Sequence, residues 1–182
     1  MSKLESFGFE LSKKTKSLET WYEIVDISSN VFVYSVRISG NLKNAYLLEN
    51  KDGRRILTVN KISSLSDNFK FLKDDFHFAS FSYRRNFFIS KFEIQIGKNT
   101  YYGSSLRNTN FKFIGSDKKV LFEFYKIVEG SRKRKIVVVN ELFNPEIGII
   151  VSVILDRITE PKKSKEPQHS AILYGKDFQS TF

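Results

Sequence analysis

Most of the chain alternates between apolar and polar residues in short segments separated by turn residues. The alternating segments are residues 7–11, 21–26, 31–38, 45–49, 54–62, 76–80, 83–88, 89–96, 100–103, 111–114, 120–128 and 135–139. A period of two predicts half-buried strands, and turn signals about every 8 to 12 residues are typical of an antiparallel sandwich or barrel. The strongest hairpin signal is Lys51-Asp52-Gly53. We expect residues 63–75 to form a loop or one short helix.

The longest apolar run, NPEIGIIVSVILDRIT at residues 144–159, departs from this alternation. Asn144 is a good N-cap, and Pro145 suits the first helical position, where its missing N–H is not needed. Arg157 suits the negative C-terminal end of a helix, and Pro161 would stop it. The run therefore favours a helix over residues 144–158, although its β-branched residues also fit a buried strand.

A helix at residues 144–158 would be apolar on every side, so it must be enclosed by the rest of the protein. The run is too short to cross a bilayer, which takes about 20 apolar residues. A closed barrel can surround such a helix, whereas a sandwich fills its own interior. We therefore predict a mainly β protein, a closed antiparallel barrel of about 12 strands enclosing a hydrophobic C-terminal helix. It would span residues 1–160.

The ends of the chain are more polar. Lys13, Lys14 and Lys16 are expected in a solvated turn after the first strand. Residues 161–182 begin with a charged, proline-containing stretch that predicts a mobile tail. Residues 171–182 would dock as an edge strand or trail from the domain.

Composition supports a β fold and excludes thiol chemistry. The 182 residues suit one domain, and 18 Phe, 8 Tyr and 1 Trp are residue types that fit pleated sheets. The absence of Cys excludes disulfides, thiolate metal sites and a Cys nucleophile. The first residues lack the apolar segment of a signal peptide, so we expect a cytoplasmic protein.

Four segments, AYLLENKDGRRILTVNKI, FEIQIGKNTYYG, FKFIGSDKKVLFEFYKI and KIVVVNELFNPEIGIIVSVILDRI, follow one another in an order that resembles the tubby-like superfamily. The resemblance covers about residues 7–159 and is closest to the LURP-one-related group, which shares its fold with tubby C-terminal domains and phospholipid scramblases. It implies a twelve-stranded barrel around a hydrophobic helix.

The resemblance also implies a binding module without enzymatic activity. Tubby domains bind phosphoinositides, and scramblases act on membranes. The Cys-rich segment and calcium-loop acids of scramblases have no counterpart here, because the chain has no Cys and Asp52-Gly53 lacks flanking acids. The phosphoinositide-binding lysines of tubby domains find no position-by-position match.

Familiar catalytic patterns are missing from the sequence. It contains no P-loop, dinucleotide-binding, nucleophile-elbow or zinc-protease motif. His77 and His169 stand apart from each other and from any triad or metal-site spacing, so we interpret both as structural or incidental. Asp74-Asp75, the only adjacent carboxylate pair, fits a solvated loop or helix cap better than an acid/base pair. We expect no catalytic residue, no metal site and no cofactor.

Basic residues near predicted turns are the better candidates for a site. The net charge of +10 attracts anionic lipid, nucleic acid or an acidic partner. The candidate anion-binding residues are Arg54, Arg55, Arg84, Arg85, Lys118, Lys119, Arg132, Lys133, Arg134 and Lys135. If several gather at one end of the barrel, they would form a cationic rim that binds phosphate groups.

Three functions remain open at this point. The first is binding of anionic lipid head groups or a membrane surface. The alternative is nucleic-acid binding, with Tyr83 or Phe87 stacking on bases. An enzyme would need a polar cavity beside the helix, which the apolar run argues against. The same basic residues would also occur at turns simply because charge stays hydrated there.

Overall fold

The computed structural model describes residues 6–17, 19–39, 45–63, 65–85, 89–106, 110–115 and 117–160. Its elements, in chain order, are β1 (Ser6–Lys16), β2 (Glu19–Asp26), β3 (Val31–Ser39), β4 (Ala45–Asn50), β5 (Arg55–Lys61), β6 (Asp67–Lys73), β7 (Phe76–Arg85), β8 (Ile89–Ile96), β9 (Asn99–Leu106), β10 (Asn110–Ile114), β11 (Val120–Glu129), β12 (Arg132–Asn140) and α1 (Pro145–Ile158).

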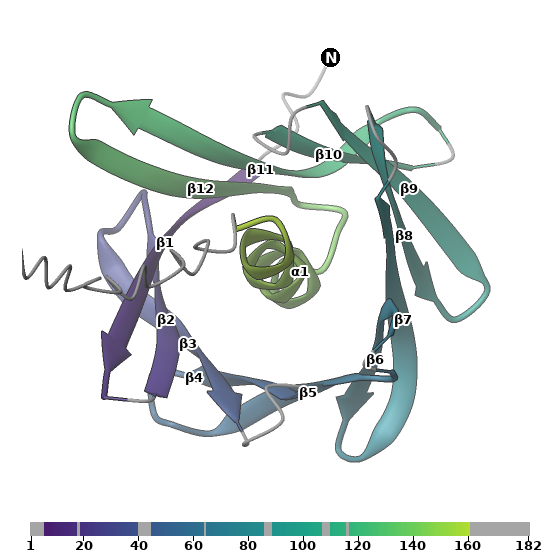
Figure 1. Ribbon diagram of the computed structural model, residues 1–182, viewed down its shortest axis with the longest axis horizontal. Coiled ribbons are helices and arrows are strands. Elements are labelled where there is room, and N and C mark those ends of the chain that lie inside the picture. Colours follow the sequence, from purple (N-terminus) through teal and green to yellow (C-terminus); the bar gives the residue numbers. More distant parts are fainter. Residues whose placement is uncertain are drawn as a thin grey trace, which may run out of the picture.

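Within the described residues, all strands belong to one closed antiparallel barrel, in which each strand pairs with its neighbours in the sequence (Figure 1). The ring closes where β1 pairs with β12, with Phe7 opposite Val139. Closure satisfies the backbone groups that an open sheet would expose at its edges. The predicted fold, an antiparallel barrel around a C-terminal helix, is confirmed.

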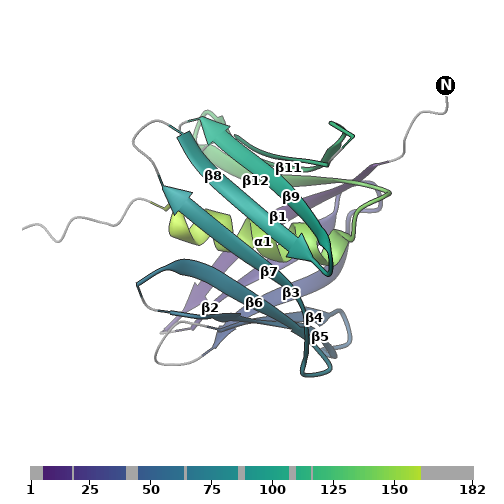
Figure 2. The ribbon, with the colours of Figure 1, turned by 90° about the vertical axis from the view of Figure 1, so that its right-hand side faces the viewer.

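The helix α1 runs along the inside of the barrel (Figures 1 and 2). It starts as predicted, because the Asn144 side chain accepts a hydrogen bond from the Ile147 N–H at 3.0 Å. Every residue from Ile147 to Asp156 is buried. The helix lies so close to β12 that a Cβ on Gly148 would be 3.0 Å from a methyl group of Val139. The alternative of a buried strand is therefore wrong.

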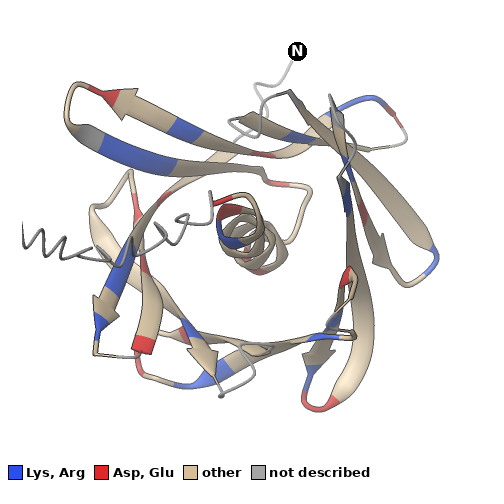
Figure 3. Cartoon of the chain, in the orientation of Figure 1, with Lys and Arg blue, Asp and Glu red and all other residues tan. Residues whose placement is uncertain are grey.

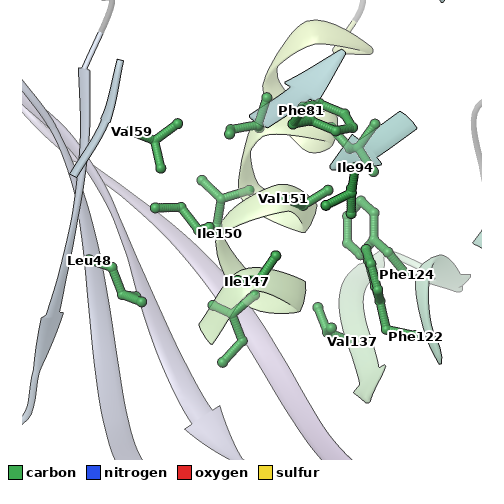
Figure 4. Close-up of a cluster of buried hydrophobic side chains, with 14 of the residues drawn as sticks. Leu48, Val59, Phe81, Ile94, Phe122, Phe124, Val137, Ile147, Ile150 and Val151 are labelled. Atoms are coloured by element: carbon green, nitrogen blue, oxygen red, sulfur yellow. The ribbon is translucent and has the colours of Figure 1, made fainter. Parts of the chain in front are cut away.

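Inward-facing side chains from the strands fill the space around α1 (Figure 4). Aliphatic residues such as Leu48 and Val59 lie on one side of the helix, while Phe rings lie on the other (Figure 4). Phe113 stacks on Phe122 with 4.3 Å between ring centroids. Gly103 leaves room for the Phe113 ring, since a Cβ there would approach that ring to 2.9 Å. Such aromatic pairs add about 0.5 to 1.5 kcal/mol beyond the area they bury.

Residues 63–75 do not form a loop or helix. Most of them form β6, because Phe69 and Phe71 alternate with polar residues and are buried inside the barrel. The polar residues at either end of this short alternation obscured it. Asp74 and Asp75 form the tight turn to β7, with φ angles of 49° and 66°.

The expected turn at Lys13, Lys14 and Lys16 is also wrong. These residues continue β1, which pairs with β2 as far as Lys16 opposite Glu19. Backbone pairing with β2 holds the lysines in a strand although their side chains are polar. The predicted tail at residues 161–182 lies outside the described residues.

Candidate functional site

The two ends of the barrel differ, and the strand order decides which residues each end carries. In an up-and-down barrel, successive hairpin turns lie alternately at opposite ends. We call the end where α1 begins the N-terminal mouth; it carries the turns after β2, β4, β6, β8, β10 and β12. The end where α1 finishes, the C-terminal mouth, carries the turns after β1, β3, β5, β7, β9 and β11.

The ten basic residues predicted from the sequence are divided between these ends. Arg54 and Arg55 follow β4, and Lys118 and Lys119 follow β10, so these four lie at the N-terminal mouth. Arg84, Arg85, Arg132, Lys133, Arg134 and Lys135 lie at the C-terminal mouth. The structure thus brings together six of the ten and separates them from the other four.

The environments of these six side chains differ. Arg84 and Lys133 are exposed to solvent. The Arg134 guanidinium pairs with Glu10 on the neighbouring strand, with 2.9 Å between the nearest nitrogen and oxygen. Lys135 points into the barrel and pairs with the helix, as described below. The side chains of Arg85 and Arg132 lie outside the described part of the structure.

Positive charge exceeds negative charge at the C-terminal mouth, as the positions of the residues along the strands show. Figure 3 marks the Lys, Arg, Asp and Glu residues around the barrel wall. The described Lys and Arg side chains in this half of the barrel are Lys13, Lys14, Lys16, Arg37, Lys61, Arg84, Lys91, Lys126, Lys133, Arg134, Lys135 and Arg157. The described acids in this half are Glu19, Asp67, Glu129, Asp156 and Glu160. Glu10, the partner of Arg134, and Lys70 lie near the middle of their strands, between the two halves.

The N-terminal half has the opposite balance. Its described acids are Glu23, Asp26, Glu49, Asp52, Asp74, Asp75, Glu93, Asp117, Glu123, Glu141 and Glu146. Its described cations are Lys51, Arg54, Arg55, Lys73, Lys98, Lys112, Lys118 and Lys119. Among the described residues, charge is therefore polarised along the barrel axis, with a basic C-terminal mouth, and the ion pairs Lys14–Glu23 and Arg37–Glu49 join the two halves.

The floor of the C-terminal mouth is a buried cluster around Asp156, near the end of α1. The Lys135 ammonium donates to Asp156 Oδ2 at 2.6 Å, and Lys126 Nζ lies 3.2 Å from Oδ1. The Tyr22 hydroxyl donates to Oδ2 at 2.8 Å. Lys126 also donates to the Thr159 hydroxyl at 2.8 Å. One carboxylate thus holds two lysines from adjacent strands against the helix.

These contacts alter the proton affinity of each group. Burial alone would raise the pKa of Asp156, but the hydrogen bond from Lys135 and the charge of Lys126 lower it below its usual value. Burial lowers the pKa of Lys126, and Asp156 partly offsets that effect. Burial and the neighbouring Asp156 carboxylate raise the pKa of the Tyr22 hydroxyl. Because its pKa is below the usual value, the Asp156 side chain is an ionised carboxylate at neutral pH, and the Tyr22 hydroxyl stays protonated.

Further polar contacts surround this floor. Lys13 pairs with Glu160, just beyond α1, at 2.7 Å, and Lys61 pairs with Asp67 at 2.8 Å. The Arg157 guanidinium lies over the Tyr46 ring, 5.7 Å from its centroid. One buried nitrogen of Arg157 has no hydrogen-bond partner among the described residues.

Three apolar side chains protrude from the rim beside these charges. Ile62 and Leu65, in the turn between β5 and β6, are 63% and 96% exposed. Val128, near the turn between β11 and β12, is 66% exposed. The C-terminal mouth therefore presents exposed aliphatic side chains next to cations. This combination suits a boundary between a charged layer and an apolar layer.

The other sequence candidates contribute less to this site. His77 is exposed on β7 at the opposite end, and His169 lies outside the described residues. In the described part of the chain, no three His, Asp or Glu side chains gather as a metal site. Tyr83 is buried, stacks on Phe92 and shares a hydrogen bond with Ser90, so it does not present a ring at the surface. Phe87 is outside the described residues.

Sequence reasoning missed Lys126 and Asp156, the centre of the cluster. A signal was available, because Lys126 is in phase with the buried Phe122 and Phe124. Asp156 directly continues the apolar run, but the sequence does not show that a lysine meets it from each of two strands.

Comparisons with known proteins identify the fold. No family model matches the sequence, and no curated protein does. The structure is similar to the X-ray structure of an Arabidopsis thaliana protein, with a TM-score of 0.61 and 12% identity over 84% of this chain and 91% of that chain. No helix in the described residues is long and apolar enough to cross a membrane. The chain thus shares its fold, a closed barrel with one C-terminal helix, with this plant protein.

Proposed function

We propose that this chain is a LURP-one-related, tubby-like binding module without enzymatic activity that docks its C-terminal mouth on an anionic membrane surface. Phosphate groups of lipid heads would contact the basic rim. Ile62 and Leu65 would enter the interfacial layer. A cytoplasmic location suits this role, because the cytoplasmic leaflet carries the anionic lipids.

The polarisation of charge along the barrel axis carries this proposal. A basic mouth facing a negative surface gains about 1 kcal/mol for each cation near that surface. The more acidic N-terminal mouth would then face away from the membrane, so the same field orients the molecule. The four basic residues near β4 and β10 would play no part in binding.

The protruding aliphatic side chains favour lipid over nucleic acid. Nucleic-acid modules that read single strands combine cations with aromatic rings on which bases stack. Leu65 cannot stack in this way, and Tyr83 is buried inside the barrel. Burial of Leu65 in an interfacial layer would contribute about 1.5 to 3 kcal/mol. Nucleic-acid binding remains the alternative that an experiment must exclude.

The test is co-sedimentation with neutral, phosphatidylserine-containing and phosphoinositide-containing vesicles at low and physiological salt. Arg84→Glu/Lys133→Glu reverses two exposed charges at the C-terminal mouth. Arg54→Glu/Lys118→Glu makes the same charge change at the N-terminal mouth and is the matched control. We expect the first pair to weaken binding at least about tenfold and the second to leave it nearly unchanged.

Leu65→Ser separates insertion from simple charge attraction. We expect it to weaken binding about tenfold at physiological salt while leaving the charge unchanged. A single-stranded oligonucleotide is added as competitor. Equal losses for both charge-reversal pairs, or displacement of vesicles by the oligonucleotide, would refute the lipid proposal.

A further inference from the structure

A groove of about 1070 Å³ lies on the outer wall of the barrel, over β2, β3 and β4. The outer wall of a barrel is normally convex, so a hollow there requires a local distortion. Pairing of β2 with β3 shifts register between Ile24 and Val25, and such a bulge bends and twists the strand that contains it. This groove is separate from the C-terminal mouth cluster, which faces the barrel interior.

The groove combines an apolar floor with charged edges. Trp21, Val25, Phe32 and Leu47 provide the apolar lining. The charged and polar lining residues are Glu19, Thr20, Glu23, Ser35, Arg37 and Ser39. An apolar strip with both acidic and basic groups beside it suits an extended peptide that carries aliphatic or aromatic side chains and both charges.

The described chain ends at the same mouth of the barrel as one end of this groove, which Glu19, Thr20 and Ser39 line. Glu160 is fixed to Lys13 on β1 by two contacts of 2.7 and 2.9 Å. Lys14, the next residue of β1, is paired across the sheet with Trp21 of the groove. Lys13 is in phase with the buried Phe9 and Leu11, so Glu160 lies on the inner side of the barrel wall. Residues 161–170 would therefore have to pass over the rim at the end of β1 and β2 to reach the groove on the outer side.

The composition of residues 161–182 matches the groove. Residues 161–170, PKKSKEPQHS, are polar and span at most about 33 Å when extended. They are followed by Ala171-Ile172-Leu173-Tyr174 and then by Lys176 and Asp177. The apolar residues suit the floor at Trp21 and Leu47. Lys176 could pair with Glu19 or Glu23 at the edges of the groove, and Asp177 could pair with Arg37.

We propose that residues 171–182 of this chain occupy the groove on β2, β3 and β4. The barrel is closed, so these residues cannot add to it as an edge strand; they bind through side chains to its outer face. The tether keeps the effective concentration of the segment high, on the order of millimolar. This goes beyond the proposed membrane docking, because it uses another face and other residues.

Trp21 reports directly on this contact, because the chain has only one Trp. We compare the full-length chain with Ile172→Asp/Leu173→Asp, which places charges where apolar side chains would meet the groove. We expect about a twofold larger acrylamide quenching constant for Trp21, with emission shifted to longer wavelength. Ser164→Asp/Gln168→Asp adds the same charge in the polar stretch and should leave both signals unchanged.

Engineered cysteines test the position of the segment, since the natural chain has none. Ser35→Cys in the groove, combined with Ala171→Cys, should form a disulfide in a glutathione buffer. Ser104→Cys, exposed on β9 of another part of the wall, is the control partner for Ala171→Cys. We expect the equilibrium constant for disulfide formation to be at least about tenfold larger for the groove pair than for the control pair.

Three outcomes would overturn the proposal. One is equal Trp21 quenching in the two tail variants, and a second is equal oxidation of the two cysteine pairs. A third is protection of Trp21 that falls when the protein is diluted, because that would assign the groove to a second copy. Vesicle binding is measured separately, so failure here leaves the proposed membrane function intact.

Discussion

Asp156 shows how a single residue acquires its role from its surroundings. It is the only acid among the buried residues of the described chain, at 2% exposure. An isolated buried carboxylate would be neutral or destabilising, but here two ammonium groups and one hydroxyl contact it. The cluster fixes the end of α1 to β2, β11 and β12.

Asp156→Asn should destabilise the protein by about 3 kcal/mol at pH 7. This value is at the low end of the range for breaking a buried ion pair, because the Lys126 and Lys135 side chains keep 21% and 20% exposure. Asn keeps the shape and can accept a hydrogen bond from Tyr22, but it removes the negative charge that Lys126 and Lys135 share. Urea unfolding measures the difference, with Asp52→Asn in an exposed turn as the control.

The loss of stability caused by Asp156→Asn should become smaller as the pH falls. The pKa of Asp156 is lower in the folded state than in the unfolded chain, so its contribution is complete above about pH 4 and is lost as pH falls through the folded value. The stability gap between wild type and variant should therefore narrow on acidification. A gap that stays constant between pH 2 and pH 7 would contradict the buried ion-pair arrangement.

At the scale of elements, α1 determines the packing of the barrel. Its central residues, from Ile147 to Leu155, are all buried. Phe rings from β7, β8, β10 and β11 fill the side away from the aliphatic wall. Without the helix, these side chains would face an empty interior.

Ile150→Asp should prevent the protein from folding into a soluble barrel. Ile150 has 0% exposure, and no Lys or Arg is among the buried residues of the described chain, so an introduced carboxylate would be unpaired. Ile150→Val, which removes one methylene, is the control and should cost only about 0.5 to 1.5 kcal/mol. Soluble yield and thermal unfolding by circular dichroism measure both variants. A melting temperature unchanged in Ile150→Asp would rule out the enclosed helix.

At the scale of the whole molecule, the number of strands determines which turns share an end. Each added strand moves every later turn to the opposite mouth. If residues 63–75 were a loop, Arg54 and Arg84 would lie at the same end. Because β6 exists, they lie at opposite ends. The basic surface is thus a consequence of topology as well as of composition.

Deletion of residues 162–182 should leave the barrel folded. The ring already closes through β1 and β12, and α1 is complete at Ile158. Far-ultraviolet circular dichroism should retain its β signature, and unfolding should remain cooperative. A deleted protein without β structure would show that the C-terminal segment belongs to the fold. Exposure of Trp21 should increase at the same time, if that segment covers the groove.

The sequence alone determined the helix, most strands and the closed barrel. Asn144, Pro145 and the uninterrupted apolar run specify a helix that must be enclosed, and local hydrogen bonding and burial are sufficient to predict it. Lys51-Asp52-Gly53 likewise defines its hairpin, since Gly53 adopts the required positive φ of 77°. These signals depend on neighbours in the chain.

Only the tertiary structure decided the candidate site. Lys126 and Lys135 meet Asp156 because three elements converge inside the barrel, and no local pattern specifies that convergence. The division of the basic residues between two mouths depends on strand parity, which a single missed strand reverses. Long-range pairing therefore positions the charges, while the local sequence determines only that they are near turns.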